Sequence, residues 1–213
     1  MQPRRPGQEH FRKHIAIDQH MKISLAVFLT IVGLLSNSCA RPSKQVPAAL
    51  IECQYFPNLE PAVCEMRDQE VVVPQRSLAN ISFGPDGLGA IVIKGRELYF
   101  VTRQGKTAPA LNFDNGPDYF VEGLARTVQN GHVGFVDTHL VPVVAPVWDF
   151  AWPFQGGVAK VCMGCVETPA GEHRIRTGGK WGYIDKHGKV VVPVIYDAVS
   201  LPPAEVAARE VAR

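Results

Sequence analysis

The chain has 213 residues, 46% of them hydrophobic and 20% charged, which is enough for one globular domain with appendages. Its nineteen Gly and seventeen Pro favour many turns and few long helices. Residues 1–40 contain five of the 22 basic and two of the 20 acidic residues, so 17 basic and 18 acidic residues remain in 41–213. Nucleic-acid binding needs a basic surface that displaces counterions from phosphates, and this balance therefore argues against a nucleic-acid partner.

The first forty residues divide into a polar extension and an export signal. Residues 1–20 are polar and mixed in charge, which is unusual ahead of a signal, so we expect a non-native extension with translation starting at Met21. A long n-region of the signal is the alternative. Residues 21–40 combine a charged start, an apolar run too short for a comfortable membrane span and a small polar end. We expect an N-terminal signal helix and export to the periplasm; a buried core helix is the alternative.

Cys39 is a candidate lipidation site. It resembles the cysteine of a lipobox, although Ser36 stands three residues before it where lipoproteins usually carry Leu. Ordinary cleavage after Ala40 is the alternative. An acylated Cys39, or an uncleaved signal, would hold the protein at the membrane of the cell envelope.

Residues 41–70 form a Cys-containing segment, and residues 71–213 repeat one phrase. Gly131–Asp137 (GHVGFVD) and Gly179–Asp185 (GKWGYID) agree in both Gly, the aromatic, the β-branched residue and the Asp, and Glu97–Thr102 is a weaker copy. The aromatic residues of the three copies are 35 and 48 residues apart and are Phe100, Phe135 and Tyr183. Such self-similarity is typical of repeat architectures.

Two further phrases keep this register. Phe120–Arg126 (FVEGLAR) matches Phe154–Lys160 (FQGGVAK), and a valine run ending in Pro occurs at Val71–Pro74 and at Val190–Pro193. The whole pattern resembles the WG (also called KWG) repeat family, whose consensus is closest to Gly179–Asp197 (GKWGYIDKHGKVVVPVIYD). The resemblance implies an all-β fold and leaves the function open, because the role of that family is mostly unknown.

Each copy is predicted to be a small antiparallel meander. Leu124–Val128 is followed by Asn130-Gly131, the strongest signal for a two-residue hairpin turn, and by a second strand at Val133–Asp137. A third strand, Val190–Val192 in the last copy, should stop at Pro193, which cannot donate to a ladder. One meander cannot bury its apolar face alone. We therefore expect an all-β fold of antiparallel β-meander repeats, stacked in an open array or a propeller-like arrangement.

The spacing between Phe135 and Tyr183 is 13 residues longer than that between Phe100 and Phe135, which indicates a 13-residue insertion between Val161 and Gly179. It predicts an extended hairpin, with Val158–Glu167 leading out, Thr168–Gly171 at the tip and His173–Trp181 leading back. A long decorated loop in a repeat array is a natural place for a specific function.

Four cysteines follow Cys39, and an even number in an exported protein implies disulfides. Of the three pairings we favour Cys53 with Cys64 and Cys162 with Cys165. Cys162-Met-Gly-Cys165 is also a CxxC motif, for which a thiol-redox site or half of a zinc site is the alternative. The flanks of this motif predict strand, whereas redox motifs begin a helix, and a zinc site would need two more ligands.

Other polar residues recur with the repeat and are therefore interpreted as architectural. His139 and His187 occupy the same exposed turn position, so we expect neither metal binding nor catalysis from them. The recurring carboxylates are expected to hold turns through Asx-type hydrogen bonds; they are Asp137, Asp185, Asp149 and Asp197.

Aromatic residues crowd the run Val147–Phe154. Trp148 and Phe154 stand at repeat positions and are expected to be core. Trp152 has no repeat counterpart, which makes it the best candidate for an exposed ligand contact.

No catalytic signature occurs, neither a nucleophile elbow, nor HExxH, nor a phosphate or dinucleotide loop. We therefore expect a non-enzymatic binding or interaction module of the envelope without catalytic residues, metal ligands or cofactor. Its partner would be a protein or an envelope polymer. The alternative is a metal-binding or thiol-redox protein that uses the Cys162–Cys165 hairpin.

Overall fold

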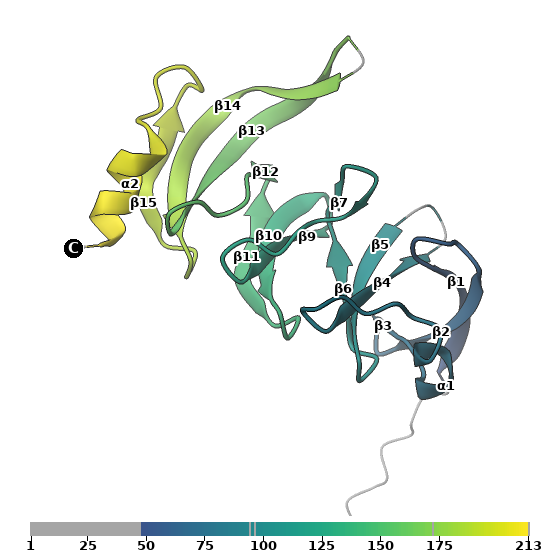
Figure 1. Ribbon diagram of the computed structural model, residues 1–213. Helices are drawn as coiled ribbons and strands as arrows, with labels where there is room; N and C mark the ends of the chain where they lie inside the picture. Colours follow the sequence, from purple (N-terminus) through teal and green to yellow (C-terminus); the bar gives the residue numbers. More distant parts are fainter. Residues whose placement is uncertain (1–47, 94, 96, 172, 213) are drawn as a thin grey trace, which may run out of the picture. The chain divides into compact units, whose positions relative to one another are not determined.

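The computed structural model describes residues 48–212 apart from positions 94, 96 and 172. The described residues fold mainly into antiparallel strands, which confirms the expected all-β fold (Figure 1). The extension, the signal and Cys39 lie outside the described residues. Within the described part, no helix is long and apolar enough to cross a membrane.

The first sheet has six antiparallel strands in the order β3-β2-β1-β4-β5-β6. Their bounds are β1 (Ala49–Tyr55), β2 (Pro61–Arg67), β3 (Glu70–Val72), β4 (Leu88–Ile93), β5 (Glu97–Thr102) and β6 (Thr107–Ala110), with the short helix α1 (Gln75–Leu78) after β3. The strands β1, β2 and β3 form a meander of their own. The Cys-containing segment thus shares one sheet with the first repeat copy.

Two smaller sheets contain the second and third copies (Figure 1). The second copy is β9 (Leu124–Gln129), β10 (His132–Asp137) and β11 (Pro142–Trp148), in the order β11-β10-β9. The third sheet has the order β12-β13-β14-β15 and consists of β12 (Phe150–Ala151), β13 (Val158–Ala170), β14 (His173–Asp185) and β15 (Val190–Tyr196). A small hairpin, β7 (Asn112–Phe113) with β8 (Gly116–Pro117), precedes the second copy, and helix α2 (Ala204–Val211) follows the third.

The hairpin turn between β9 and β10 forms as predicted. Asn130 and Gly131 have φ values of 52° and 80°, the two positive values of a type I′ turn. The inserted hairpin also forms, but β13 and β14 run further than expected and leave only Gly171 and residue 172 between them. In Figure 1 the two long strands extend beyond β12 as an arm.

The third strand of each repeat does not stop at its proline, which corrects the expectation for Pro193. β15 continues to Tyr196. On this strand Val192 pairs with Tyr183 and Tyr196 pairs with Trp181, so the residues between Val192 and Tyr196 form a bulge. β11 makes the same irregularity between Val144 and Trp148. Inside such a bulge a residue has no ladder partner, so the missing N–H of proline costs nothing there.

These bulges explain the glycine of the repeat. A Cβ on Gly182 would lie 2.5 Å from the carbonyl oxygen of Val192, and one on Gly134 would lie 2.4 Å from that of Val144. Only glycine tolerates such a close backbone approach. The first copy has Tyr99 at this position and pairs it with Pro109 in a regular ladder without a bulge.

The turn after the middle strand is the same in all three copies. Oδ1 of Asp185 accepts from the backbone N–H groups of His187 and Lys189, both at 2.9 Å. Asp137 makes the equivalent bonds. Oγ1 of Thr102 accepts from the N–H of Lys106 at 3.2 Å, so the weak first copy shares the turn. The turn positions are 35 and 48 residues apart, the spacing of the aromatic residues.

Successive copies bury one another. The same face of the first and of the second copy packs against the following copy, and the corresponding face of the third packs against α2. The second copy contributes Leu124, Phe135 and Val144 to its core, and the third contributes Val158, Tyr183 and Val192. Helix α2 thus covers the face that a further copy would cover, and the described repeats form an open stack.

Candidate functional site

A groove of about 440 Å³ lies where the second and third copies meet the start of α2. It is lined by the loop before β13, by β13 and β14, and by Ala204. The side chains that shape it are Trp152, Pro153, Gln155, Lys160 and Tyr183. This volume lies within the usual range for small-molecule sites.

Trp152 forms one wall of the groove. Its side chain is 45% exposed, and its ring meets the ring of Phe150 edge-on with centroids 5.3 Å apart. Trp148 and Phe154 are buried, as their repeat positions predict. The structure therefore leaves Trp152 as the accessible ring of the aromatic run, while its contact with a ligand stays a prediction.

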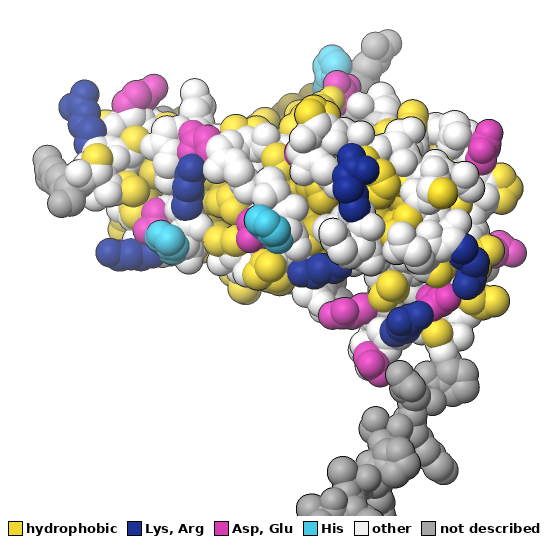
Figure 2. Space-filling model, turned by 60° about the horizontal axis from the view of Figure 1, so that its bottom comes forward, with side chains coloured by type: hydrophobic (Ala, Val, Ile, Leu, Met, Phe, Trp, Pro, Cys, Tyr) yellow, Lys and Arg dark blue, Asp and Glu magenta, His cyan; other side chains and the backbone are white. Residues whose placement is uncertain are grey.

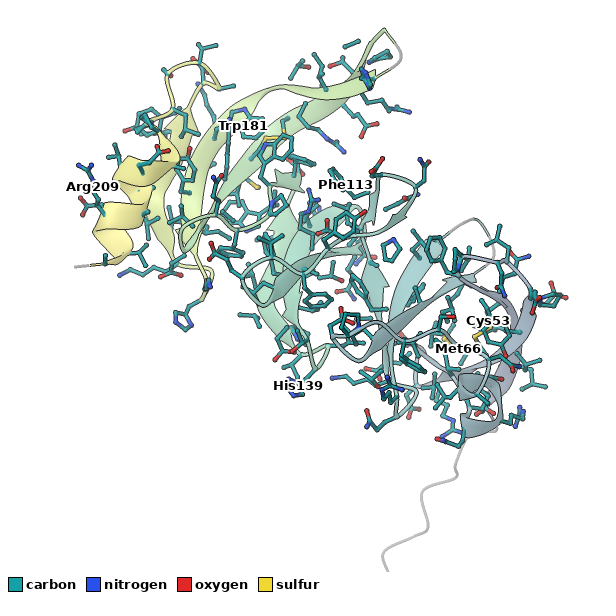
Figure 3. The ribbon with its side chains drawn as sticks, viewed as in Figure 1. Cys53, Met66, Phe113, His139, Trp181 and Arg209 are labelled. Atoms are coloured by element: carbon teal, nitrogen blue, oxygen red, sulfur yellow. A yellow bond between two sulfur atoms is a disulfide. The ribbon has the colours of Figure 1, made fainter. Side chains whose placement is uncertain are left out.

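Lys160 supplies a cation to the groove. It is half-buried on β13, and its Nζ lies 4.6 Å from the centroid of the Trp181 ring on β14. Trp181 is labelled in Figure 3. Burial lowers the pKa of this ammonium group. Beside it, burial and then the carboxylate of Glu205 raise the pKa of the Tyr183 hydroxyl. The groove thus combines three aromatic lining residues, Trp152, Phe154 and Tyr183, with one partly desolvated positive charge, and the Glu205 carboxylate lies close enough to act on the Tyr183 hydroxyl.

Arg126 occupies the same repeat position as Lys160 but is fully buried between the second and third copies. Its Nε and Nη2 donate to the two carboxylate oxygens of Asp118, at 2.9 and 2.6 Å. A third donor, Nη1, reaches the carbonyl oxygen of Ala151. Neither cation stands out in the sequence by its type, although the matched phrases FVEGLAR and FQGGVAK both end in a basic residue.

The cysteines lie in the two favoured pairs, and their placement is compatible with disulfides. The Cα atoms of Cys53 and Cys64 are 5.9 Å apart on β1 and β2, and those of Cys162 and Cys165 are 6.1 Å apart on β13. Residues three apart on a regular strand point to opposite faces. Gly164, with a φ of 75°, turns the chain so that the second pair can meet.

Asp149 and Asp197 do not hold turns through Asx bonds, which corrects that expectation. Asp149 accepts from the N–H of Gly164 beside the second cysteine pair, and its Oδ1 lies 3.2 Å from Nδ1 of His132. Asp197 pairs with Nζ of Lys180 at 2.9 Å. Both aspartates follow a bulged third strand, where the nearest partner is a different element rather than their own turn.

The exposed histidines are in the predicted place. His139 and His187 lie at the same position of the shared turn, and Figure 3 shows His139 projecting from its end. Among the described residues no group of three or more His, Cys, Asp and Glu is arranged to hold a metal ion.

The face of the protein drawn in Figure 2 carries basic and acidic side chains interspersed with one another.

Glu122 ties the second copy to the third. Its carboxylate accepts from the N–H groups of Gly156 and Gly157, at 2.6 and 3.1 Å, and pairs with Nζ of Lys186 at 3.0 Å. The hydrogen bond from Lys186 is the main reason that the pKa of Glu122 is lowered, and the two glycine N–H groups add to it. This contact fixes one side of the loop that carries Trp152.

Comparison with protein families agrees with this repeat geometry. The family model described as "WG containing repeat" matches residues 134–164 and 181–202. The protein contains WG repeats. The first matched segment starts at Gly134 of β10 and the second at Trp181 of β14. Neither curated proteins nor solved structures show a significant match to the chain.

Proposed function

We propose that this WG-repeat protein is an exported, envelope-associated binding module without enzymatic activity, and that the groove beside Trp152 is its binding site. The observation that carries the proposal is an exposed Trp152 ring over a preformed concave surface. Export is supported by the sequence pattern of residues 21–40 and by cysteines placed as disulfide partners, which persist in oxidising compartments.

The site is built to bind rather than to react. The strands β13 and β14 of the third repeat line it with Val158, Lys160 and Tyr183, and Glu122 anchors the loop that carries Trp152. A rigid aromatic ring gives contact area at low entropic cost. Binding of a small molecule to a preformed, largely apolar groove follows from this arrangement.

The test is a ligand-observed NMR screen of the full chain against envelope-derived peptides, glycans and small acids. We expect compounds that bind the protein but not a Trp152→Ala variant. The matched control is Tyr119→Ala, which removes another exposed ring, 62% accessible, that does not line the groove. A screen without any ligand that depends on Trp152, or loss of binding in the Tyr119 variant alone, would overturn the proposal.

The alternative function uses Cys162 and Cys165. It is favoured by their place at the base of the arm, next to the exposed residues Met163 and Gly164. Thiol titration of purified envelope material under denaturing, non-reducing conditions distinguishes the two functions. We expect no free thiol from these two residues; free thiols together with one bound zinc per chain would favour the alternative.

Export and anchoring are tested separately by mass spectrometry of the mature N-terminus. We expect a chain that begins at an acylated Cys39. A chain that retains residues 1–20, or one that starts after Ala40 without lipid, would contradict lipid anchoring.

A further inference from the structure

We infer that the groove binds a carboxylate attached to an apolar body, with Lys160 as the cation that receives the carboxylate. This inference rests on the proposed function, because it names the ligand class of the same groove. The ligand we commit to is a free small organic acid.

The protein contains an internal example of this recognition. In the preceding repeat, Arg126 receives the Asp118 carboxylate through two parallel hydrogen bonds, at 2.9 and 2.6 Å. Asp118 lies two residues before Phe120, and Trp152 lies two residues before the corresponding Phe154. In the last repeat Lys160 occupies the position of Arg126, so the cation is kept. Trp152 occupies the position of Asp118, so the carboxylate is replaced by an aromatic ring.

Lys160 is thus a cation whose repeat counterpart is neutralised by Asp118, whereas no carboxylate of the described residues forms an ion pair with Lys160 itself. Within the described part of the chain no ion pair reaches its ammonium group, which lies 4.6 Å from the centroid of the Trp181 ring. A half-buried ammonium group that has given up part of its hydration gains from an anionic partner. Because Lys160 lines the groove, that partner can arrive from solvent.

The rest of the lining selects what the carboxylate is attached to. Pro153, Val158 and Ala204 contribute apolar surface, and the Trp152 and Tyr183 rings flank it. Beyond the ring N–H and O–H groups, Gln155 and Lys160 are the polar side chains of the lining. A sugar would require more hydrogen-bond partners than these, whereas an aromatic or aliphatic acid buries its body and leaves one charge to satisfy.

The experiment measures binding of phenylacetate to the full chain by NMR titration, with phenylacetamide as the neutral probe of equal shape. We expect phenylacetate to bind and phenylacetamide to bind at least about tenfold more weakly. Lys160→Met should weaken phenylacetate binding by a similar factor, and Lys160→Arg should restore most of it. Lys180→Met is the matched control, because Lys180 is an exposed lysine on β14 outside the groove.

The remaining outcomes separate this inference from the proposed function. Equal binding of both probes, or binding of neither while other ligands depend on Trp152, would refute the carboxylate site and leave the binding module standing. Absence of any ligand that depends on Trp152 would refute both. A peptide ending in Phe is tested with a free and with an amidated carboxyl group. Binding of the free peptide without binding of phenylacetate would replace the small acid by a peptide carboxyl terminus.

Discussion

At the scale of single residues, the buried ion pair between Arg126 and Asp118 is the most consequential contact. Both side chains are essentially inaccessible, and Arg126 of the second repeat reaches the carbonyl oxygen of Ala151 in the third sheet. Burying two charges is costly, and a pair survives only when its hydrogen bonds are satisfied. Here Arg126 uses three donors and Asp118 also accepts from the backbone N–H of Arg126. Through the hydrogen bond from Nη1 to Ala151, the pair also links the second repeat to the third sheet.

Arg126→Met is expected to destabilise the protein by about 3–5 kcal/mol, because it leaves the buried Asp118 carboxylate without its countercharge and with only the backbone N–H of residue 126 as a hydrogen-bond donor. The double variant Arg126→Met with Asp118→Leu should be more stable than the single variant, since both charges are then gone. Urea unfolding of the three proteins measures this. Additive losses in the double variant would show that the two side chains act independently.

Gly182 is the second residue with a specific role, because it lets β15 bulge over β14. Gly182→Ala should cost about 1–3 kcal/mol, since a Cβ would meet the Val192 carbonyl oxygen at 2.5 Å. Gly116→Ala is the control, because its Cβ would meet only the Phe56 ring edge at 3.3 Å. The midpoint of thermal unfolding reports both changes, and an unchanged midpoint for Gly182→Ala would contradict this role of glycine.

At the scale of elements, Glu122 joins three loops that are far apart in the sequence. Its carboxylate contacts the Gly156-Gly157 turn and Lys186. The backbone N–H groups of the two glycines leave the carboxylate well partnered although it is near the surface. A carboxylate with a lowered pKa contributes stability above its ordinary pKa of 4.5, and this contribution is lost as the pH falls through the lowered value.

Glu122→Gln should therefore reduce stability near neutral pH by no more than about 1 kcal/mol, as is usual for an exposed ion pair. The difference from the original protein should shrink as the pH falls below 4.5. Urea unfolding across this pH range, with the exposed Glu70→Gln as control, measures it. A difference that grows on acidification would give the wrong sign for this linkage.

At the scale of the whole described domain, stability depends on covering one face of each repeat in turn. Helix α2 completes the series by packing Ala207, fully buried, against Val158, Tyr183 and Val192. Repeats of this size cannot bury their apolar faces alone. The helix therefore has the role of a terminal cap.

Ala207→Asp should release α2, because the new carboxylate would be buried without a partner. We expect amide hydrogen exchange in β13–β15 to accelerate while β1–β6 remain protected. Val206→Asp is the matched control on the same helix, since Val206 is 47% exposed. Unchanged exchange in the Ala207 variant would show that the cap is dispensable.

Part of the candidate site could be predicted from the sequence. Trp152 stood out because it has no counterpart in the matched repeat phrases, and its ring is the exposed one of the aromatic run at the groove. Lys160 was missed, although its match with Arg126 lay in the repeat phrase itself. What the sequence could not show is that one of these cations is neutralised by Asp118 and the other faces a groove.

Local and periodic features can be predicted from the amino-acid sequence: the repeat register, the turn at Asn130-Gly131 and the turns held by Asp137 and Asp185. These follow from backbone preferences of adjacent residues, which repetition makes visible. The stacking order, the Glu122–Lys186 contact across 64 residues, the cap by α2 and the groove become visible only in the folded protein. Those features depend on which apolar faces of the repeats pack against each other, and this packing exists only in the folded protein.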